Sequence, residues 1–301
     1  MIAWRRYSPR ELRVPSNRNF DDTDVRGWRG GMPAIVTWAG RLRLSAVLVL
    51  LAAGDAGAAE PPCPPTSPRH LDLPATTAAL AAGKPVTIVA FGSSSTEGTG
   101  ATAPDRTYPA RLEALLRAKW PGTAAIVLNR GIGGQTADTM LARLDDDVLA
   151  IRPILVIWQA GANEALRHAD PALFSARVNE GVRRIAAAGA DVVLMDNQLS
   201  PVMPDLENQA VYGAILAHEA TGRAVSLFSR TALMREWLLA GGSADGMIGP
   251  DGIHHTDRGY ACLAESLADA IVTSIEIPGH AGDPAMGIAS TSGVQSWSAR
   301  Q

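Results

Sequence analysis

The sequence predicts an α/β fold of three layers, in which helices cover both faces of a doubly wound sheet of five parallel strands. Short apolar runs alternate with longer helical patterns from about residue 85 to residue 275, and this alternation is typical of repeated strand–helix units. Most of the short runs are continuously apolar. Such runs indicate strands that are buried on both faces, as in a parallel sheet between helical layers.

Each predicted strand is too short to be a typical helix. The five strands are expected, in order, at Val86–Phe91, Ala125–Asn129, Ile154–Gln159, Asp191–Asp196 and Ala224–Phe228. Longer segments with helical patterns separate and follow these strands. The helices are expected at Tyr108–Trp120, Thr136–Ala150, Pro171–Ala188, Leu206–Thr221, Ser229–Ala240 and Asp257–Ile275.

One domain is expected at residues 85–277, after a Pro- and Ala-rich lead-in at residues 60–84. Residues 278–301 are rich in Gly and Ser and have too little apolar pattern to pack, so we expect a flexible tail there. Residues 1–31 show no periodicity. They are expected either to be an unstructured extension or to precede the true start of translation at Met32.

A signal peptide is predicted at residues 32–59. Two arginines are followed by the apolar run Leu44–Ala53 and then by small residues up to Ala59, in the order of a charged region, an apolar region and a cleavage site. The apolar run is well below the roughly 20 residues that span a bilayer. We therefore expect export to the periplasm or the extracellular space, cleavage near Ala58 or Ala59, and no stable membrane span afterwards.

The charged residues are nearly balanced, with 27 Lys and Arg against 30 Asp and Glu. This balance gives no electrostatic footprint for nucleic acid or an anionic membrane surface, and a small, roughly neutral substrate fits it better. There are two cysteines, Cys63 and Cys262. In an oxidising compartment they either pair, tying the mature amino terminus to the last helix, or remain two unpaired thiols. The sequence leaves both possibilities open.

Ligands of open parallel sheets bind beyond the carboxyl ends of the strands, and the unusual residues of this sequence fall there. The clusters after the first three strands are Gly92–Gly98, Asn129–Thr136 and Gly161–Glu164, and a fourth cluster, Asp251–His254, precedes the last helix. A serine hydroxyl becomes a nucleophile when an imidazole accepts its proton and a carboxylate orients that imidazole. The clusters contain all three of these groups.

In the Asp251–His254 cluster, the carboxylate can reach one ring nitrogen while the other faces a serine on a different loop. This spacing is common, and a helix-initiating turn with local hydrogen bonds is the alternative interpretation. His255 is a competing imidazole, which we interpret as a surface or rim residue. Acyl transfer also needs donors for the oxygen that becomes negative. The N–H groups of Ser94 and Gly134 and the amide of Asn163 would meet if their strands are neighbours, although each alone is more typical of a turn.

The four clusters resemble the motif blocks of the GDSL or SGNH hydrolases, from about residue 86 to residue 267. The resemblance implies the flavodoxin-like fold of SGNH hydrolases and the activity of a secreted bacterial-type serine esterase. Block by block, it implies that Ser94 is the nucleophile, His254 the base and Asp251 the acid that orients the base. It also implies that Ser94, Gly134 and Asn163 form the oxyanion hole.

Three positions depart from the family pattern. Ser93 replaces the common Asp before the nucleophile, Ser95 replaces the usual Leu, and Glu164 replaces the Asp that follows the asparagine. These are neighbours of the catalytic groups, so the reaction type stands, but such neighbours shape the pocket and make inference of the substrate by analogy unsafe. Ser93 and Ser95 are also alternative hydroxyls.

The sequence therefore predicts a secreted serine hydrolase that cleaves small carboxylic esters through an acyl-enzyme. No long apolar lid is evident between the blocks, which favours short, acetyl-type acyl groups. Acylated carbohydrate, lipid and thioester substrates are all open. The alternatives are an acyltransferase that passes the acyl group to a glycan hydroxyl and a non-catalytic carbohydrate-binding module. The oligomeric state is not predicted.

Several other site types do not fit the sequence. A Gly-x-Ser-x-Gly elbow would need glycine where Thr96 stands, and a complete dinucleotide-binding turn would need glycine at Thr136. No phosphate-loop ending and no zinc-ligand spacing is found in the sequence. No cofactor and no metal are expected.

Overall fold

The computed structural model describes residues 62–275, apart from residues 201, 204–205, 223 and 242–245. The predicted signal peptide at residues 32–59, the segment 1–31 and the predicted tail at residues 278–301 lie outside the described residues. Of the helices in the described residues, none is both long enough and apolar enough to cross a bilayer.

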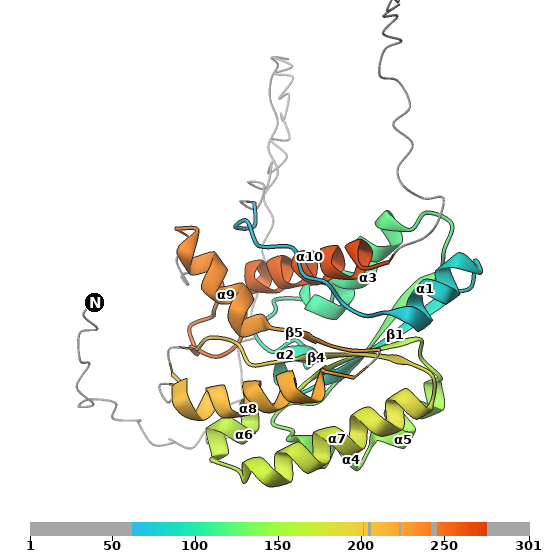
Figure 1. The fold of residues 1–301 in the computed structure, drawn as a ribbon. Helices are drawn as coiled ribbons and strands as arrows, with labels where there is room; N and C mark the ends of the chain where they lie inside the picture. The colour runs from blue at the N-terminus through green and yellow to red at the C-terminus, as the bar shows by residue number, and fades with distance from the viewer. Residues whose placement is uncertain (1–61, 201, 204–205, 223, 242–245, 276–301) are drawn as a thin grey trace, which may run out of the picture. The chain divides into compact units, whose positions relative to one another are not determined.

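Five parallel strands form the sheet between the helices of Figure 1, in the order β2-β1-β3-β4-β5. They are β1 (Val86–Gly92), β2 (Ala125–Gly131), β3 (Leu155–Gln159), β4 (Asp191–Met195) and β5 (Val225–Phe228). This is the doubly wound, flavodoxin-like order, with its switch point between β1 and β3. The predicted fold class is confirmed, and each strand differs from its predicted bounds by one or two residues.

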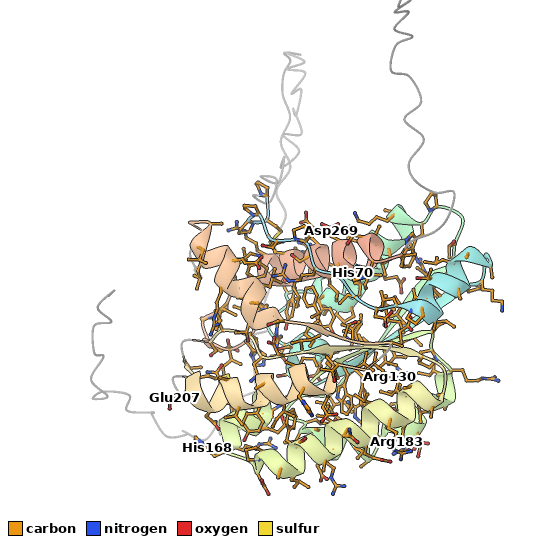
Figure 2. The ribbon with its side chains drawn as sticks, viewed as in Figure 1. His70, Arg130, His168, Arg183, Glu207 and Asp269 are labelled. Atoms are coloured by element: carbon orange, nitrogen blue, oxygen red, sulfur yellow. A yellow bond between two sulfur atoms is a disulfide. The ribbon has the colours of Figure 1, made fainter. Side chains whose placement is uncertain are left out.

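Helices cover both faces of this sheet. One face carries α1 (Pro74–Ala81), α3 (Tyr108–Lys119), α9 (Arg230–Leu239) and α10 (Asp257–Thr273). The other carries α4 (Ala137–Leu141), α5 (Leu144–Asp147), α6 (Ala162–Arg167), α7 (Pro171–Ala187) and α8 (Leu206–Glu219). Successive side chains of β1 enter opposite cores, Ile88 under the first layer and Val89 under the second. The charged Arg183 of α7 and Asp269 of α10 point away from the sheet (Figure 2).

The predicted helix at Thr136–Ala150 is wrong in its continuity. The structure has α4, an interruption at Arg143, α5 and a short 3₁₀ helix, η2 (Leu149–Ile151). Arg143 lies outside helical geometry, at φ −110° and ψ 7°, and its guanidinium donates to the carbonyl oxygens of Gly92 (3.2 Å) and Arg130 (2.9 Å). The Asp residues at 145–147 also oppose a longer helix, because negative charge is unfavourable near a helix carboxyl end.

The lead-in contains a helix, α1, that was not predicted. Asp191, at the start of β4, accepts hydrogen bonds from the N–H groups of Ala75 (3.0 Å) and Thr76 (2.8 Å). It thereby supplies the cap that Leu73, the residue before α1, does not provide. Because this cap lies 115 residues away in the sequence, no local pattern reveals the start of the helix.

Cys63 and Cys262 form a disulfide, with their Cα atoms 5.4 Å apart and a sequence separation of 199. Of the two possibilities that the sequence leaves open, the structure has the paired one. Cys262 is buried in α10. The bond therefore fastens the beginning of the described chain to the last helix.

Replacing both cysteines by serine is expected to lower the free energy of unfolding by about 2–4 kcal/mol, because a cross-link over a long loop restricts the unfolded chain. Equilibrium unfolding in urea measures this change. Dithiothreitol should reproduce the loss in the wild-type protein and leave the Cys63→Ser, Cys262→Ser variant unaffected. Equal midpoints for the two proteins without reductant would contradict the prediction.

Candidate active site

Ser94 begins α2 (Ser94–Glu97), a single helical turn directly after β1. Of the three consecutive serines, Ser93 and Ser95 are each only 2% exposed, whereas Ser94 is partly exposed. The Ser93 hydroxyl donates to the Gln159 side-chain oxygen at 3.0 Å. Ser94 is therefore the hydroxyl of the three that a substrate can reach.

The structure brings Ser94, His254 and Asp251 into one line of hydrogen bonds. His254 Nε2 lies 2.8 Å from Ser94 Oγ, and His254 Nδ1 lies 2.5 Å from Asp251 Oδ2. An ionised carboxylate can only accept, so Nδ1 carries the proton and the Nε2 lone pair faces the serine hydroxyl. The imidazole is thus placed to take a proton from Ser94.

Asp251 also shapes the turn that carries the histidine. Its Oδ1 accepts the N–H groups of Ile253 and His254, each at 3.0 Å. Partial burial works to raise the pKa of the Asp251 carboxyl, but the hydrogen bonds from the His254 ring and from these two N–H groups outweigh it and hold that pKa below its ordinary value. Asp251 therefore stays ionised beside the imidazole at neutral pH.

Gly134, one of the predicted oxyanion donors, belongs to a loop that lies against Ser94. A methyl group placed on Gly133 would be 3.9 Å from Ser94 Cβ, so the loop after β2 passes directly beside Ser94. Gly134 has φ +73°, a conformation that favours glycine. The Asn163 amide donates to Gln135 O at 2.9 Å and keeps a second N–H for a ligand.

Among the described residues, the N–H groups of Ser94 and Gly134 donate to no backbone carbonyl group. Backbone N–H groups with no protein acceptor are available to a developing negative charge. The N–H groups of Ser94 and Gly134 thus lie on neighbouring segments, and Asn163 is hydrogen-bonded to the loop that carries Gly134.

Glu164 holds two of these loops together, which the sequence did not reveal. It is buried, and its carboxylate accepts the N–H groups of Ala137 and Gly161. Burial raises the pKa of Glu164, while these N–H donors oppose the rise. The longer side chain that departs from the family's Asp spans from α6 to α4. On the outer side, Arg167 donates to Gly134 O at 2.7 Å.

His255 is buried, so its interpretation as a surface or rim residue is wrong. It pairs with Ile248 in an isolated antiparallel bridge, and successive side chains of an extended segment point to opposite sides. Its ring therefore turns inward when the ring of His254 faces Ser94. His255 Nδ1 donates to Met247 O at 3.1 Å, whereas the Ser94 hydroxyl contacts His254.

Acid is expected to destabilise the protein through His255. Burial, with the nearby charge of Arg230, lowers the pKa of His255 from 6.5 to about 3. Between these values the unfolded chain binds a proton that the folded chain does not, so stability falls as the pH falls. We expect His255→Asn, which keeps a donor for Met247 O, to lessen the loss of stability between about pH 7 and pH 4.

Urea unfolding midpoints across this pH range measure the effect. His218→Asn is the matched control, because His218 is an exposed residue of α8 and its replacement should leave the pH dependence unchanged. An identical loss of stability with acid in the wild-type and His255→Asn proteins would contradict the assignment.

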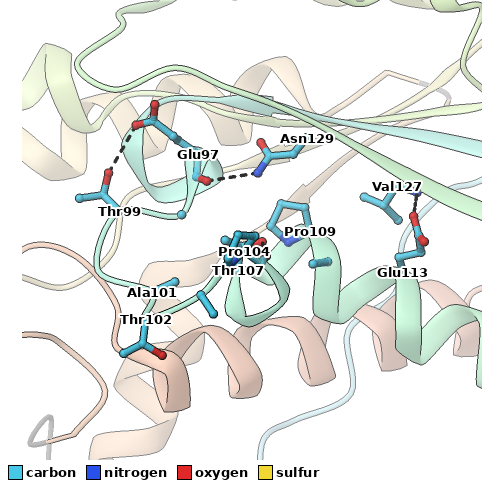
Figure 3. A pocket seen from close by; sticks show the side chains of 13 residues that line it. Glu97, Thr99, Ala101, Thr102, Pro104, Thr107, Pro109, Glu113, Val127 and Asn129 are labelled. Carbon is cyan, nitrogen blue, oxygen red and sulfur yellow. Dashed lines mark hydrogen bonds between the residues drawn. The ribbon is translucent and has the colours of Figure 1, made fainter.

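A cavity of about 690 Å³ lies beside the end of α2 (Figure 3). Residues that line it include Glu97, Thr99, Thr102, Thr107, Glu113 and Asn129. None of the three residues in the Ser94–His254–Asp251 line borders it. Within the described part of the chain, no group of three or more His, Cys, Asp or Glu side chains is arranged to hold a metal ion.

A family model described as the Non-GDSL lipase-like family matches residues 62–277. The chain belongs to this family. Ser93 and Ser95 of this chain replace the Asp and Leu of the common GDSL block, which agrees with the name Non-GDSL. As a Non-GDSL lipase-like protein it is a carboxylic ester hydrolase of the GDSL/SGNH type, as the resemblance of its sequence blocks implied. This membership decides against the non-catalytic binding module.

Two curated relatives are similar over part of this Non-GDSL lipase-like chain. Esterase TesA of Pseudomonas aeruginosa is 34% identical over 144 residues, which are 47% of this chain and 67% of the relative. An arylesterase of Vibrio mimicus is 24% identical over 172 residues, which are 56% of this chain and 80% of the relative.

Solved structures agree with the fold. The crystal structure of TesA has a TM-score of 0.53 and 25% identity, covering 62% of this chain and 99% of that one. A catalytic mutant of an acetylxylan esterase from Geobacillus stearothermophilus has a TM-score of 0.53 at 22% identity, covering 62% of this chain and 94% of that one. The second likeness concerns the fold alone.

Proposed function

We propose that this Non-GDSL lipase-like protein hydrolyses short-acyl carboxylic esters outside the cytoplasm, with Ser94 as nucleophile, His254 as base and Asp251 as the acid that orients the base. The observation that carries the proposal is the continuous line of hydrogen bonds from Ser94 Oγ to His254 Nε2 at 2.8 Å and from His254 Nδ1 to Asp251 at 2.5 Å. This arrangement suits a hydroxyl that attacks a carbonyl carbon.

In the proposed reaction, Ser94 Oγ attacks the ester carbonyl while its proton passes to His254 Nε2. The bond to the leaving alcohol breaks as the imidazolium returns that proton to the alcohol oxygen, which leaves an acyl group on Ser94. Water then attacks this acyl group, with His254 again accepting and returning a proton. Asp251 stabilises the imidazolium in both halves and keeps the ring nitrogens in their roles.

The carbonyl oxygen becomes negative in both halves. We place it among the N–H groups of Ser94 and Gly134 and the free amide hydrogen of Asn163. Loss of one such donor typically costs about 3 kcal/mol of transition-state stabilisation. The contact of Asn163 with Gln135 and that of Arg167 with Gly134 hold these donors in place before the substrate arrives.

Export is part of the proposal. A signal peptide at residues 32–59 would send the chain across a membrane, and the Cys63–Cys262 disulfide suits an oxidising compartment, because such bonds are rare in the cytosol. Amino-terminal sequencing of protein from the culture medium or periplasm tests this. We expect the chain to begin directly after Ala58 or Ala59; full-length protein in the cytosolic fraction would contradict export.

Acetyl-type substrates are proposed because the sequence between the motif blocks has no long apolar lid. Two esterases of similar fold are described as acting on acetylated xylan and acetylated mannans, so acetylated carbohydrate is a reasonable first substrate class to assay.

The test is a panel of 4-nitrophenyl esters from acetate to dodecanoate. We expect kcat/KM to fall by at least about tenfold from acetate to octanoate, because the proposed acetyl-sized acyl site would reject extra methylenes. A preference for dodecanoate would overturn the short-acyl proposal. Product analysis with added acceptor alcohols separates hydrolysis from acyl transfer to a glycan hydroxyl; predominant transfer would contradict the hydrolase assignment.

A further inference from the structure

The turn Asp251–His254, here named the catalytic turn, is held from behind by two side chains of the loop after β4. Gln198 Nε2 donates to Ile253 O at 3.0 Å, and Ser200 Oγ donates to Gly252 O at 2.6 Å. Both donors are buried, Gln198 at 1% and Ser200 at 8% exposure. The two carbonyl groups lie between the acid and the base, so these contacts fix the peptides that set their separation.

Gln198 is itself oriented by a buried cation. Arg230, at the start of α9, is 0% exposed, and its Nη2 donates to Gln198 Oε1 at 2.6 Å. A guanidinium has donors and no acceptor, so Gln198 must present its oxygen to Arg230 and its amide N–H to Ile253 O. Arg230 Nε in turn donates to the carbonyl oxygen of Asp196 at 3.2 Å, directly after β4.

Burying a guanidinium is costly unless it is paired and hydrogen-bonded. Features that are costly for folding, such as a buried charge, tend to lie at functional sites in native proteins. Here the buried guanidinium of Arg230 contacts Gln198, which in turn contacts the catalytic turn. The most direct consequence of these contacts is a fixed position for His254.

We propose that Gln198 and Ser200 are positioning residues for catalysis and that Arg230 fixes the orientation of Gln198. The proposal rests on the proposed role of His254 and Asp251. A tilt of the catalytic turn would change the 2.8 Å separation of His254 Nε2 and Ser94 Oγ. Misplacement of a catalytic group by about 1 Å can cost roughly a hundredfold in rate.

Gln198→Glu tests this with the least disturbance. The variant keeps the size of the side chain and an oxygen that faces Arg230, with which it forms an ion pair, but it removes the donor to Ile253 O. We expect kcat for 4-nitrophenyl acetate to fall about 10- to 100-fold with KM nearly unchanged, while the urea midpoint stays close to that of the wild type.

Gln209→Glu is the matched control. Gln209 is also a buried glutamine, and its amide donates to Met203 O without touching the catalytic turn. Its replacement should change kcat by less than about twofold. Should Gln198→Glu not fold, Ser200→Ala takes its place, with an expected loss of about three- to tenfold in kcat that Ser200→Thr restores at least in part.

A double variant separates this inference from the proposed function. When Ser94→Ala has removed the nucleophile, the position of His254 no longer matters, and Gln198→Glu should cause no further loss of the residual activity. Near-wild-type kcat in folded Gln198→Glu, with Ser94→Ala inactive, would overturn the positioning role alone. An active Ser94→Ala protein would instead overturn the proposed function.

Discussion

Replacement of Ser94 by alanine is expected to lower kcat for ester hydrolysis by about five to six orders of magnitude, because loss of a serine nucleophile leaves only binding and the oxyanion donors. The variant should fold normally. Ser94 begins the short helix α2 and is only partly buried, so removal of its hydroxyl leaves no large cavity. Stopped assays at high enzyme concentration are needed to measure the residual rate.

Ser93→Ala and Ser95→Ala are the matched controls for Ser94→Ala. They remove a hydroxyl from the positions on either side, where both side chains are 2% exposed. Each should keep kcat within about tenfold of the wild type, since neither hydroxyl contacts His254. A fluorophosphonate reagent should label the peptide that contains Ser94 and no other serine peptide. Loss of labelling in Ser95→Ala rather than in Ser94→Ala would show that Ser95 is the nucleophile.

Asp251→Asn is expected to lower kcat by about four orders of magnitude, the loss seen when the orienting carboxylate of a serine triad becomes an amide. An amide N–H would donate to His254 Nδ1, which places the ring proton on Nε2, toward Ser94. The imidazole then cannot accept the serine proton. The asparagine oxygen still accepts the two N–H groups that Asp251 Oδ1 accepts, so the turn should remain.

The measurement for Asp251→Asn is kcat near pH 7.5, together with the urea midpoint to show that the turn and the fold persist. Asp257→Asn is a suitable control. Asp257 is a neighbouring carboxylate whose oxygens accept from Thr102 instead of a histidine, and its replacement should leave at least about a third of kcat. More than a tenth of wild-type kcat in a folded Asp251→Asn protein would show that the carboxylate does not orient the base.

The order of strands and helices could be predicted because burial on both faces leaves short, continuous apolar runs in the sequence. The sheet itself follows from rules that hold for most chains of this kind. Helix α1 could not be predicted, because its cap comes from Asp191 in another strand. The break at Arg143 was also missed, because its cause is a contact with the ends of β1 and β2.

The same distinction applies to the site. Ser94, Gly134, Asn163, Asp251 and His254 lie in short clusters of unusual composition, and such clusters are visible without coordinates. Gln198, Arg230 and Glu164 are single polar residues in ordinary surroundings, and their importance lies in contacts with distant loops. His255 was misplaced because the sequence alone does not say which of two adjacent rings faces the core.

The Cys63–Cys262 disulfide has a consequence for the resistance of the protein to proteolysis. Residues 94, 134, 163, 251 and 254 all lie between Cys63 and Cys262 in the sequence, so the disulfide closes a covalent ring that contains every group assigned to the reaction. A protease that cuts one peptide bond anywhere within that ring opens it but releases no fragment. After such a cut, the two segments of the chain, and the assigned catalytic residues that they carry, would remain covalently linked.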